Sequence, residues 1–433
     1  MKSKEFCFSI IPAVRVTTLV RPEIRLYTET ADAVRINIRK GDKELKKYIF
    51  ALEKGVVRIV GIDLSFTAGD IFLDFNFMAG ENTVFRESYA YQVVDTSLPS
   101  TTLMDGCWIS IYHWSEDEAR FFNKALKTMK DEDFKDHIRA MKPVGINGII
   151  IQSVFDNNAY ANCHRMEESG YTGKAFYPSK LYPGRIELSA DDPVEAVLSA
   201  ADECGMHVFV GVGLYAWFDF SPASLKWHKA VATELFEMYG HHKSFYGWYI
   251  SEEIFGALYA EWDKVPYEKY KDIADFFREF KAFAKTLAPT KPVALAPNNI
   301  NFTHYEKEWQ TILPNVDILI PFAFARDLEH LNVTEIKRIC EECATHMWVD
   351  MEVFKNPFPD GLIPKETDEL IKEIRIYDDV EQIYGYQFTG MLNPPESPFD
   401  LGGEPAKCLY EGYRKYYEDF MKKQNANGKP GDI

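Results

Sequence analysis

The chain has 433 residues, of which 46% are hydrophobic and 15% aromatic, and its formal net charge is −17. A chain of this length usually forms two domains, and its composition excludes the disordered and collagen-like classes. The acidic charge argues against nucleic acid and anionic lipid surfaces as partners, and no apolar run is long enough to span a membrane.

The first 100 residues have the pattern of a small β domain. Apolar and polar residues alternate over 34–38 and 71–77, and turn sequences follow at 40–42 and 80–82. Short alternating strands between turns predict an immunoglobulin-like β-sandwich over residues 1–100. The polar, proline-containing stretch that ends this region predicts a linker. No cluster of reactive side chains stands out here, so we expect this domain to pack against the next one or support the edge of its substrate site.

From residue 101 onward, short apolar runs alternate with amphipathic segments. The runs predict eight strands, at 107–112, 146–152, 206–213, 246–252, 292–296, 316–322, 346–352 and 383–389. The segments between them predict helices, among them 118–142, 191–204, 222–239, 265–287, 331–343 and 365–378. This alternation predicts a (β/α)8 barrel over 101–425 with a flexible tail at 426–433. An open doubly wound sheet is the alternative, but the first strand leads into no glycine-rich phosphate loop.

The connection after the second predicted strand, from residue 153 to about 190, is far longer than usual for such a loop. It contains the aromatic and histidine residues Tyr160, His164, Tyr171, Tyr177 and Tyr182. Long loops at the carboxyl face of a barrel usually carry function. We therefore expect this loop to wall the substrate pocket, with at least one of Tyr160, Tyr171 or Tyr177 lining it.

Acidic residues stand at the ends of the fourth and seventh predicted strands, namely Glu252 and Glu253 on one and Asp350 and Glu352 on the other. These two strands lie nearly opposite each other across a barrel, and cleavage of a glycosidic bond needs two facing carboxyl groups. Because side chains alternate along a strand, Glu253 shares its direction with Tyr249, whereas Glu252 points the other way. We predict Glu253 as acid/base and Glu352 as nucleophile, with Glu252 and Asp350 in support. The alternative is that Glu252 and Glu253 only cap the following helix.

Polar and aromatic side chains near the other predicted strand ends are candidates for binding sugar hydroxyls and rings. Any one of them can be a structural residue, but a set at most strand ends favours a binding site. They are His113, Trp114, Gln152, Tyr215, Trp217, Tyr249, Asn298, Asn299 and Gln387. The sequence has no HExxH motif, histidine triplet, calcium loop, Walker loop or nucleophile elbow, so it implies neither a metal nor another cofactor.

The cysteines and the N-terminus bear on the compartment. Seven cysteines without regular spacing are typical of a reducing environment. The first residues are basic, but Pro12 and Arg15 interrupt the apolar run that follows, and no cleavage site comes after it. We expect a cytoplasmic location, or export if a signal has been removed. Nothing in the sequence indicates an oligomeric state.

Four stretches of the barrel region carry a family resemblance. They are 141–147 running into 149–152, 247–250 with Glu253, 348–354, and 386–388 with 393–395. In these stretches the chain resembles glycosyl hydrolases of uncharacterised specificity that are common in gut Bacteroidetes-type bacteria and are similar to clan A retaining glycosidases. The resemblance implies a carbohydrate or glycoside substrate and hydrolysis by two carboxylates.

The sequence departs from the clan A pattern in two places. The acid/base of clan A follows an asparagine that bonds the sugar 2-hydroxyl, and Glu252 stands in that place here. Clan A also has a tyrosine near the nucleophile, where the sixth strand of this chain ends in Phe322 and Phe324. Two other hypotheses therefore stay open. One is a catalytically silent carbohydrate-binding barrel, and the other is a barrel lyase or isomerase on a sugar derivative, with His113 or Lys355 as base.

A retaining mechanism makes definite demands on the two carboxyl groups. Retaining enzymes hold them about 5–5.5 Å apart, and we predict this spacing for Glu253 and Glu352. The acid/base must give up and then take back a proton, so we expect neighbouring carboxylates and burial to raise the pKa of Glu253 toward about 6–7. Glu352 should stay ionised. Donors for it would come from Asn298, Asn299 or Gln387.

Overall fold

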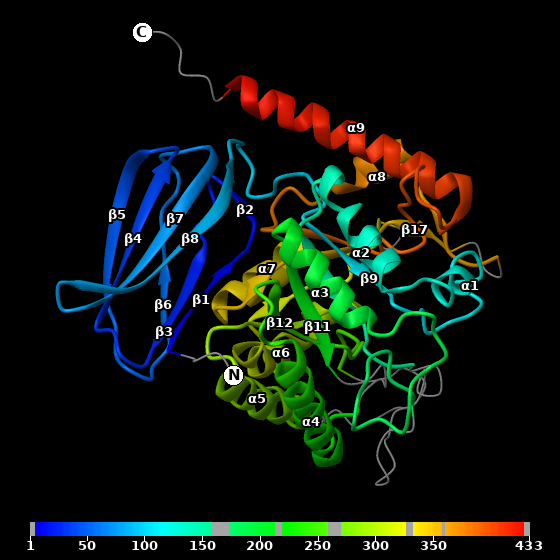
Figure 1. The fold of residues 1–433 in the computed structure, drawn as a ribbon, viewed down its shortest axis with the longest axis horizontal. Coiled ribbons are helices and arrows are strands. Elements are labelled where there is room, and N and C mark those ends of the chain that lie inside the picture. Colours follow the sequence, from blue (N-terminus) through cyan, green and yellow to red (C-terminus); the bar gives the residue numbers. More distant parts are fainter. Residues whose placement is uncertain are drawn as a thin grey trace.

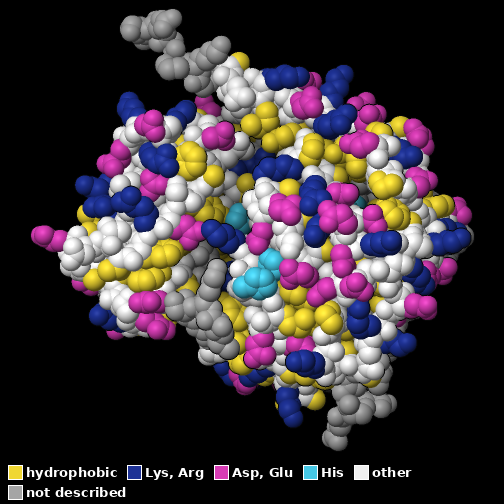
Figure 2. Space-filling view, in the orientation of Figure 1, with side chains coloured by type: hydrophobic (Ala, Val, Ile, Leu, Met, Phe, Trp, Pro, Cys, Tyr) yellow, Lys and Arg dark blue, Asp and Glu magenta, His cyan; other side chains and the backbone are white. Residues whose placement is uncertain are grey.

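The computed structural model describes residues 5–156, 173–212, 219–258, 270–325, 332–356 and 360–427. Within these residues, the strands form a nine-stranded, nearly closed parallel sheet and three smaller sheets. Figure 1 shows two of the smaller sheets on one side of the molecule, and the parallel sheet with its helices on the other. Acidic and basic side chains are interspersed over the face seen in Figure 2. No helix in the described ranges combines the length and apolarity needed to cross a membrane.

The first 94 residues contribute two sheets that share one apolar core. One sheet has the antiparallel order β1-β3-β6, and the other has the order β2-β8-β7-β4-β5, in which only the β2–β8 pair is parallel. The predicted alternation is present, since Val34, Ile36 and Ile38 are all fully buried. The strands are β1 (Phe6–Ile11), β2 (Arg15–Thr17), β3 (Glu23–Thr28), β4 (Ala33–Lys40), β5 (Lys43–Ala51), β6 (Arg58–Gly61), β7 (Gly69–Ala79) and β8 (Asn82–Val94).

The parallel sheet contains all eight strands predicted for the second region, each shorter than predicted. Its order is β15-β14-β13-β12-β11-β10-β9-β19-β16. The outer members β15 and β16 are two halves of the predicted strand 346–352, interrupted at Trp348, so the two ends of the sheet meet. A parallel bridge between Phe322 and Asp350 adds to this closure. The strands are β9 (Gly106–Ile109), β10 (Gly148–Ile151), β11 (His207–Val212), β12 (Phe245–Ile250), β13 (Val293–Leu295), β14 (Ile318–Leu319), β15 (His346–Met347), β16 (Val349–Glu352) and β19 (Ile383–Tyr386).

The helices follow the predicted segments with two kinds of correction. The single helix predicted at 118–142 is wrong, because turns precede two short helices and Asp133 accepts a hydrogen bond from the backbone N–H of Lys130, which starts the second one. Helices α6 and α9 were not predicted. The helices are α1 (Asn123–Leu126), α2 (Asp131–Arg139), α3 (Pro193–Cys204), α4 (Pro222–Tyr239), α5 (Tyr270–Leu287), α6 (Glu306–Ile312), α7 (Val333–Glu342), α8 (Thr367–Ile374) and α9 (Gly403–Asn427).

Short elements and the C-terminus complete the fold. Three 3-10 turns, η1 (Lys142–Val144), η4 (Phe302–Tyr305) and η5 (Leu313–Asn315), and a small hairpin of β17 (Phe354–Lys355) and β18 (Ile363–Pro364) lie between the main elements. Residues 426 and 427 were predicted to begin the flexible tail, but they belong to helix α9. Residues 428–433 lie outside the described part of the chain.

Local sequence signals explain where the central helices begin. Asp192 and Ser221 each cap a helix by accepting the backbone N–H three residues later, and a proline follows each of them in the first helical position. Helix α5 buries Ile273, Phe277 and Phe280 on one face, the spacing of a helix that covers a sheet. These helices therefore form because their apolar stripe packs on the outside of the parallel strands.

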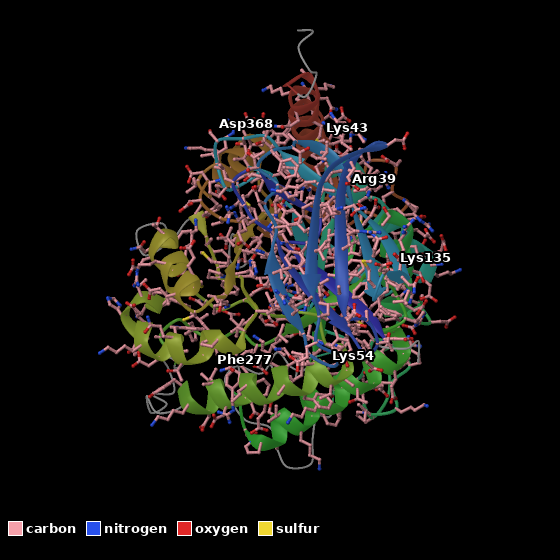
Figure 3. All side chains as sticks on the ribbon, turned by 90° about the vertical axis from the view of Figure 1, so that its left-hand side faces the viewer. Arg39, Lys43, Lys54, Lys135, Phe277 and Asp368 are labelled. Atoms are coloured by element: carbon pink, nitrogen blue, oxygen red, sulfur yellow. The ribbon has the colours of Figure 1, made fainter. Side chains whose placement is uncertain are left out.

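The N-terminal sheets pack against the amino-terminal end of the parallel sheet. Ile11 and Ala13 belong to the same apolar cluster as inward-facing strand residues such as Trp108 and Phe209. In Figure 3 the strands that carry Arg39 and Lys43 stand in front of the parallel sheet, with Phe277 of α5 below them. The opposite end of the sheet, where the strands finish, is consequently the end left for a functional site.

Candidate functional site

Acidic side chains converge at the carboxyl ends of β12 and β16. Asp350 and Glu352 are buried in β16, and Glu253 follows β12. Burial and the nearby charges of Glu352 and Glu253 raise the pKa of Asp350 well above its usual range. Burial is the larger cause of this shift, and the charges of the two other carboxyl groups act in the same direction. The ends of the fourth and seventh strands thus belong to one electrostatic site, while the 5–5.5 Å spacing of Glu253 and Glu352 stays a prediction.

Glu118 is a fourth carboxyl group at this site, and the sequence analysis missed it. It lies in the turns between β9 and α1, where burial and the charge of Glu253 raise its pKa to about 7. Its Oε2 atom is 3.7 Å from Nε2 of His113. Glu118 begins the helix predicted at 118–142, and at the start of a helix a carboxylate is an ordinary solvated group. The available signal was its distance of only five residues from His113 in the same strand-end connection.

His113 starts a chain of hydrogen bonds across the strand ends. Its Nδ1 lies 3.1 Å from the backbone N of Ser115 and 3.2 Å from the carbonyl oxygen of Ser115, which leaves Nε2 as the ring nitrogen turned toward the strand ends. That nitrogen faces the hydroxyl of Tyr386 at 3.3 Å, and the hydroxyl donates to Oε1 of Gln152 at 2.8 Å. Burial lowers the pKa of His113 to about 4, which keeps the ring neutral at pH 7. Trp114 stacks on this ring with centroids 5.7 Å apart.

Several buried polar atoms at the strand ends have no hydrogen-bond partner among the described residues. Two of them are Nε2 of Gln387 and Oδ1 of Asp350. Gln387 is fully buried, and its Oε1 accepts from the hydroxyl of Ser110 at 2.6 Å, which fixes its orientation. Buried groups left unpaired in this way are costly and call for a partner. A sugar hydroxyl, which both donates and accepts, matches this pair.

Glu252 faces away from the other carboxyl groups, toward α4. Its side chain is fully buried, and Oε1 lies 3.9 Å from Nε2 of His228 in α4. Burial and the charge of Asp219 raise the pKa of Glu252 well above its usual range, and burial lowers the pKa of His228 to about 4. Burial thus disfavours the charged form of both groups. Tyr249 belongs to the inward-facing cluster, as strand alternation predicts, and its burial and the charges of Asp350, Glu253 and Glu252 raise its pKa.

The two asparagines after β13 bond to nearby backbone. Asn299 donates from its side-chain amide to the carbonyl oxygen of Phe322, and Oδ1 of Asn298 accepts the N–H of Ile300 at 2.9 Å. Phe322 stacks on Phe324 with ring centroids 4.9 Å apart. Of the donors predicted for Glu352, Gln387 is therefore the one with a buried amide N–H group still unpartnered among the described residues.

The long loop after β10 is described over residues 153–156 and from residue 173 onward. Tyr177 is buried, and its hydroxyl donates to Oε2 of Glu234 in α4 at 2.6 Å. Tyr182 stacks on Phe155 with centroids 5.1 Å apart. The returning arm of the loop is thus held against α4. The other predicted residues Tyr160, His164, Tyr171, Tyr215 and Trp217 lie outside the described residues.

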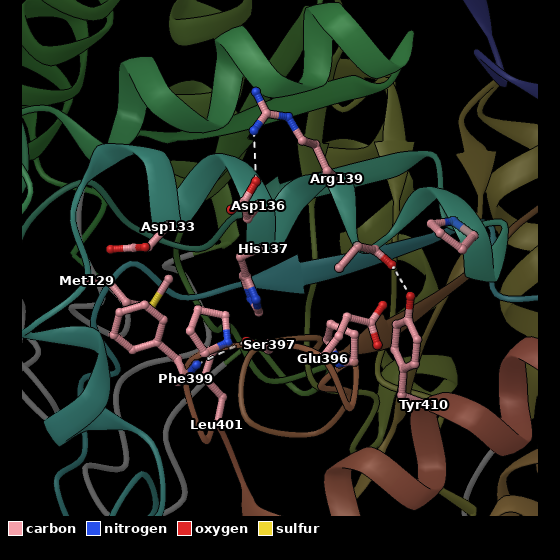
Figure 4. Close-up of a pocket in the computed structure, with 14 residues that line it drawn as sticks. Met129, Asp133, Asp136, His137, Arg139, Glu396, Ser397, Phe399, Leu401 and Tyr410 are labelled. Carbon is pink, nitrogen blue, oxygen red and sulfur yellow. Dashed lines mark hydrogen bonds and ion pairs between the residues drawn. The ribbon is translucent and has the colours of Figure 1, made fainter.

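Two cavities formed by described residues lie away from this site. One, of about 310 Å³, lies between α2 and the segment 394–401, with His137 on its wall (Figure 4). The other, of about 910 Å³, lies between the N-terminal sheets and the turns that lead into β11, β12 and β13. Neither is lined by Glu118, Glu253, Asp350 or Glu352.

Solved structures show what this fold resembles. One is described as a "putative alpha-L-fucosidase" from Bacteroides thetaiotaomicron VPI-5482, with 20% identity, a TM-score of 0.52, and coverage of 75% of this chain and 96% of that chain. A GH2 beta-galacturonidase from Eisenbergiella tayi has 12% identity, a TM-score of 0.43, and coverage of 96% and 72%. A beta-glucuronidase from Parabacteroides merdae has 12% identity, a TM-score of 0.42, and coverage of 95% and 52%. The first shows a shared fold, and no protein in the curated set matches the chain.

A family model covers the part of the chain that holds the candidate site. It matches residues 104–398, a span that contains every strand of the parallel sheet and the carboxyl groups at their ends. The description of that family is "Domain of unknown function (DUF4434)". The chain belongs to the DUF4434 family.

Proposed function

We propose that this protein is a glycoside hydrolase that cleaves a glycosidic bond with retention of configuration. The observation that carries the proposal is the placement of buried Asp350 and Glu352 in β16 and of Glu253 directly after β12, with the charges of Glu352 and Glu253 acting on Asp350. Paired carboxyl groups on opposite strands are what this hydrolysis needs. The glycosidase names of the similar structures agree with this reaction class.

In this mechanism Glu352 attacks the anomeric carbon while Glu253 protonates the departing oxygen. Glu253, now ionised, takes a proton from water, and the water oxygen displaces Glu352 from the anomeric carbon. Asp350, protonated at neutral pH because burial and its neighbours raise its pKa, can donate a hydrogen bond and adds no charge. The developing positive charge on the sugar ring then faces ionised Glu352 alone on that strand.

Several of the predicted residues, together with Tyr386 and Glu118, form the proposed substrate-binding surface. Gln387 offers its unpartnered N–H group, and the chain of His113, Tyr386 and Gln152 lies next to Glu118. Trp114 and Tyr249 offer aromatic surface to the C–H face of a sugar ring. We assign Glu252 a structural role against α4, in place of the substrate contact expected from the sequence.

The architecture behind this function is proposed in finer detail as well. Residues 101–425 would form a complete (β/α)8 barrel, since the nearly closed parallel sheet has helices between its strands. Residues 1–100 would form an immunoglobulin-like sandwich, since their two sheets share one core.

Turnover of a panel of aryl glycosides tests the proposal. Glu253→Gln should abolish most turnover of substrates with poor leaving groups and spare the first step with activated aryl leaving groups, because such groups need no proton. Glu352→Gln should lose both kinds of substrate alike. Equal, small losses from both substitutions with every leaving group would contradict the assignment.

A carbohydrate-binding barrel without activity is the second candidate. It is favoured by Phe322 and Phe324, which stack on each other where clan A enzymes place a hydrogen-bonding tyrosine. Sugar binding by wild type, measured calorimetrically, with no turnover of any glycoside in the panel would support this reading over hydrolysis.

A further inference from the structure

A cluster of nitrogen and oxygen ligands lies at the other end of the parallel sheet from the proposed active site. Glu195 stands in the first turn of α3, and His241 and His242 occupy the turn between α4 and β12. One ligand atom from each of the three lies within 4.8 Å of the other two. These residues take no part in the proposed hydrolysis.

The spacing of these atoms fits a small metal ion. Nε2 of His242 is 3.0 Å from Oε2 of Glu195. In a tetrahedral zinc site with metal–ligand bonds of about 2.1 Å, neighbouring ligand atoms are about 3.4 Å apart. This pair needs to open by only a few tenths of an ångström. The exposed His241, whose ring centroid is 4.1 Å from that of His242, can complete the set by rotating its side chain.

The surrounding hydrogen bonds orient the ligands as metal sites do. Oδ2 of Asp202 binds Nδ1 of His242 at 2.8 Å, and Oδ1 of Asp202 accepts the backbone N–H of Ser244 at 2.6 Å. A carboxylate on the second ring nitrogen fixes the tautomer that presents Nε2 to a metal. Ser199 donates to Oε1 of Glu195 at 2.9 Å, which directs Oε2 toward His242. A simple ion pair at the surface does not need these additional hydrogen bonds.

The cluster is also open to solvent on one side. His241 and Asp202 line the cavity of about 910 Å³ between the N-terminal sheets and the helices. Figure 2 shows histidine side chains at the surface beside acidic ones on this face. Three protein ligands with an open side leave room for water as a fourth ligand.

We infer that Glu195, His241 and His242 bind one divalent transition-metal ion of the Zn²⁺ class, with Asp202 positioning His242. Imidazole and carboxylate ligands suit Zn²⁺ and Co²⁺ better than Ca²⁺ or Mg²⁺, which prefer oxygen ligands only. The metal replaces the proton that His242 shares with Glu195, so binding releases a proton. None of the metal motifs sought in the sequence includes this arrangement, because its ligands come from two separate segments.

Metal titration of the purified full-length protein tests the inference. Co²⁺ should bind with a stoichiometry of one and give visible ligand-field absorption without thiolate-to-cobalt charge transfer, and Zn²⁺ should displace it. His241→Ala and Glu195→Gln should each weaken Zn²⁺ binding at least about tenfold, and Asp202→Asn by about 10–100-fold. His304→Ala, which removes an exposed histidine elsewhere, is the matched control and should leave the affinity unchanged.

The His241→Ala variant keeps the test clear of folding effects. Its side chain is exposed and stands outside the pair of carboxylate contacts made by His242, so the thermal midpoint of the metal-free protein should not change. The inference is overturned if wild type takes up no Co²⁺ or Zn²⁺. It is equally overturned if His241→Ala and Glu195→Gln bind Zn²⁺ as tightly as wild type, since the cluster would then be an ion-pair network only.

Discussion

Glu118 and Asp350 show how a crowded acidic site limits its own charge. Burial and neighbouring carboxylates raise the pKa of both groups, that of Glu118 to about 7. Like charges in close contact cannot all ionise at neutral pH. Asp350 therefore stays neutral and Glu118 titrates near pH 7. This leaves ionised carboxylate where the proposed nucleophile needs it, and a second exchangeable proton beside Glu253.

Replacing Glu118 with glutamine should remove an ionisation near pH 7 from the kcat/KM profile. It should also change the pH dependence of stability. Because the folded pKa lies above the ordinary value of 4.5, the native state binds the extra proton, and the unfolding free energy of wild type falls as pH rises from about 4.5 to 7. The unfolding free energy of Glu118→Gln should not show this decrease. Urea unfolding at pH 4.5 and 7.5 measures the decrease, with Glu116→Gln as control. A pH-independent difference in unfolding free energy between Glu118→Gln and wild type would refute the raised pKa.

The proposed structural role of Glu252 predicts that its substitution, unlike that of Glu118, has only small effects. Its side chain is buried against His228 with neither oxygen hydrogen-bonded among the described residues, and its raised pKa keeps it protonated. Glu252→Gln preserves shape and neutrality, so we expect a stability change within about 1 kcal/mol and turnover within a few-fold of wild type. Chemical denaturation and the aryl glycoside panel check both. A loss as large as that of Glu253→Gln would place Glu252 at the substrate instead.

Among the strands and helices, hydrophobic periodicity predicted the elements that have a local repeat and missed the features that depend on contacts between distant residues. Strand β10 and helix α4 were predicted because a buried apolar run and an amphipathic stripe are local signals. The break at Trp348 between β15 and β16 was not predictable, because it reflects how the sheet closes on itself. Gln387 was predicted as a polar residue in the eighth strand, but its bond to Ser110 depends on two strands that meet only in the fold.

The returning arm of the long loop depends on one side chain of α4. Glu234 accepts from Tyr177 at 2.6 Å, from the hydroxyl of Ser179 at 2.5 Å and from the N–H of Lys180 at 2.6 Å. Glu234→Ala should cost about 1–3 kcal/mol, because it removes the common acceptor of a buried hydroxyl and two further donors. Faster amide hydrogen exchange over residues 173–190 would show this loss of stability. Glu237→Ala, in the same helix and exposed, is the control; equal exchange in both variants would contradict the anchoring role.

Considered as a whole, the molecule has its N-terminal sheets fixed to the barrel-like core by buried ion pairs. Arg15 of β2 pairs with Asp105 at 2.9 Å, and Arg25 of β3 pairs with Asp317 at 2.8 Å. His346 lies between Glu23 and Glu381, which raise its pKa to about 10. These contacts, with Ile11 and Ala13 in the inward-facing cluster, make the N-terminal region part of the support of the proposed site.

Breaking one of these pairs should destabilise the whole protein. Removing Arg25 leaves Asp317 buried with Lys281 as its remaining cation, and loss of one partner of a buried pair costs about 3–5 kcal/mol. Arg25 and Lys281 hold the pKa of Asp317 below its usual range, so this stabilisation is present above the ordinary value of 3.8 and declines as pH falls below it.

Urea unfolding of Arg25→Met should therefore show the full loss at pH 7 and a smaller one near pH 3. Arg58→Met, on the exposed strand β6, removes a bond to the carbonyl of Ala51 and a cation–π contact with Phe50, and should stay within about 0.5 kcal/mol of wild type at both values. If the two variants unfold alike, the ion pair does not couple the sheets to the core. If Arg25→Met unfolds in two steps while wild type unfolds in one, the pair is what makes the two regions fold as a unit, and turnover should fall with the first step.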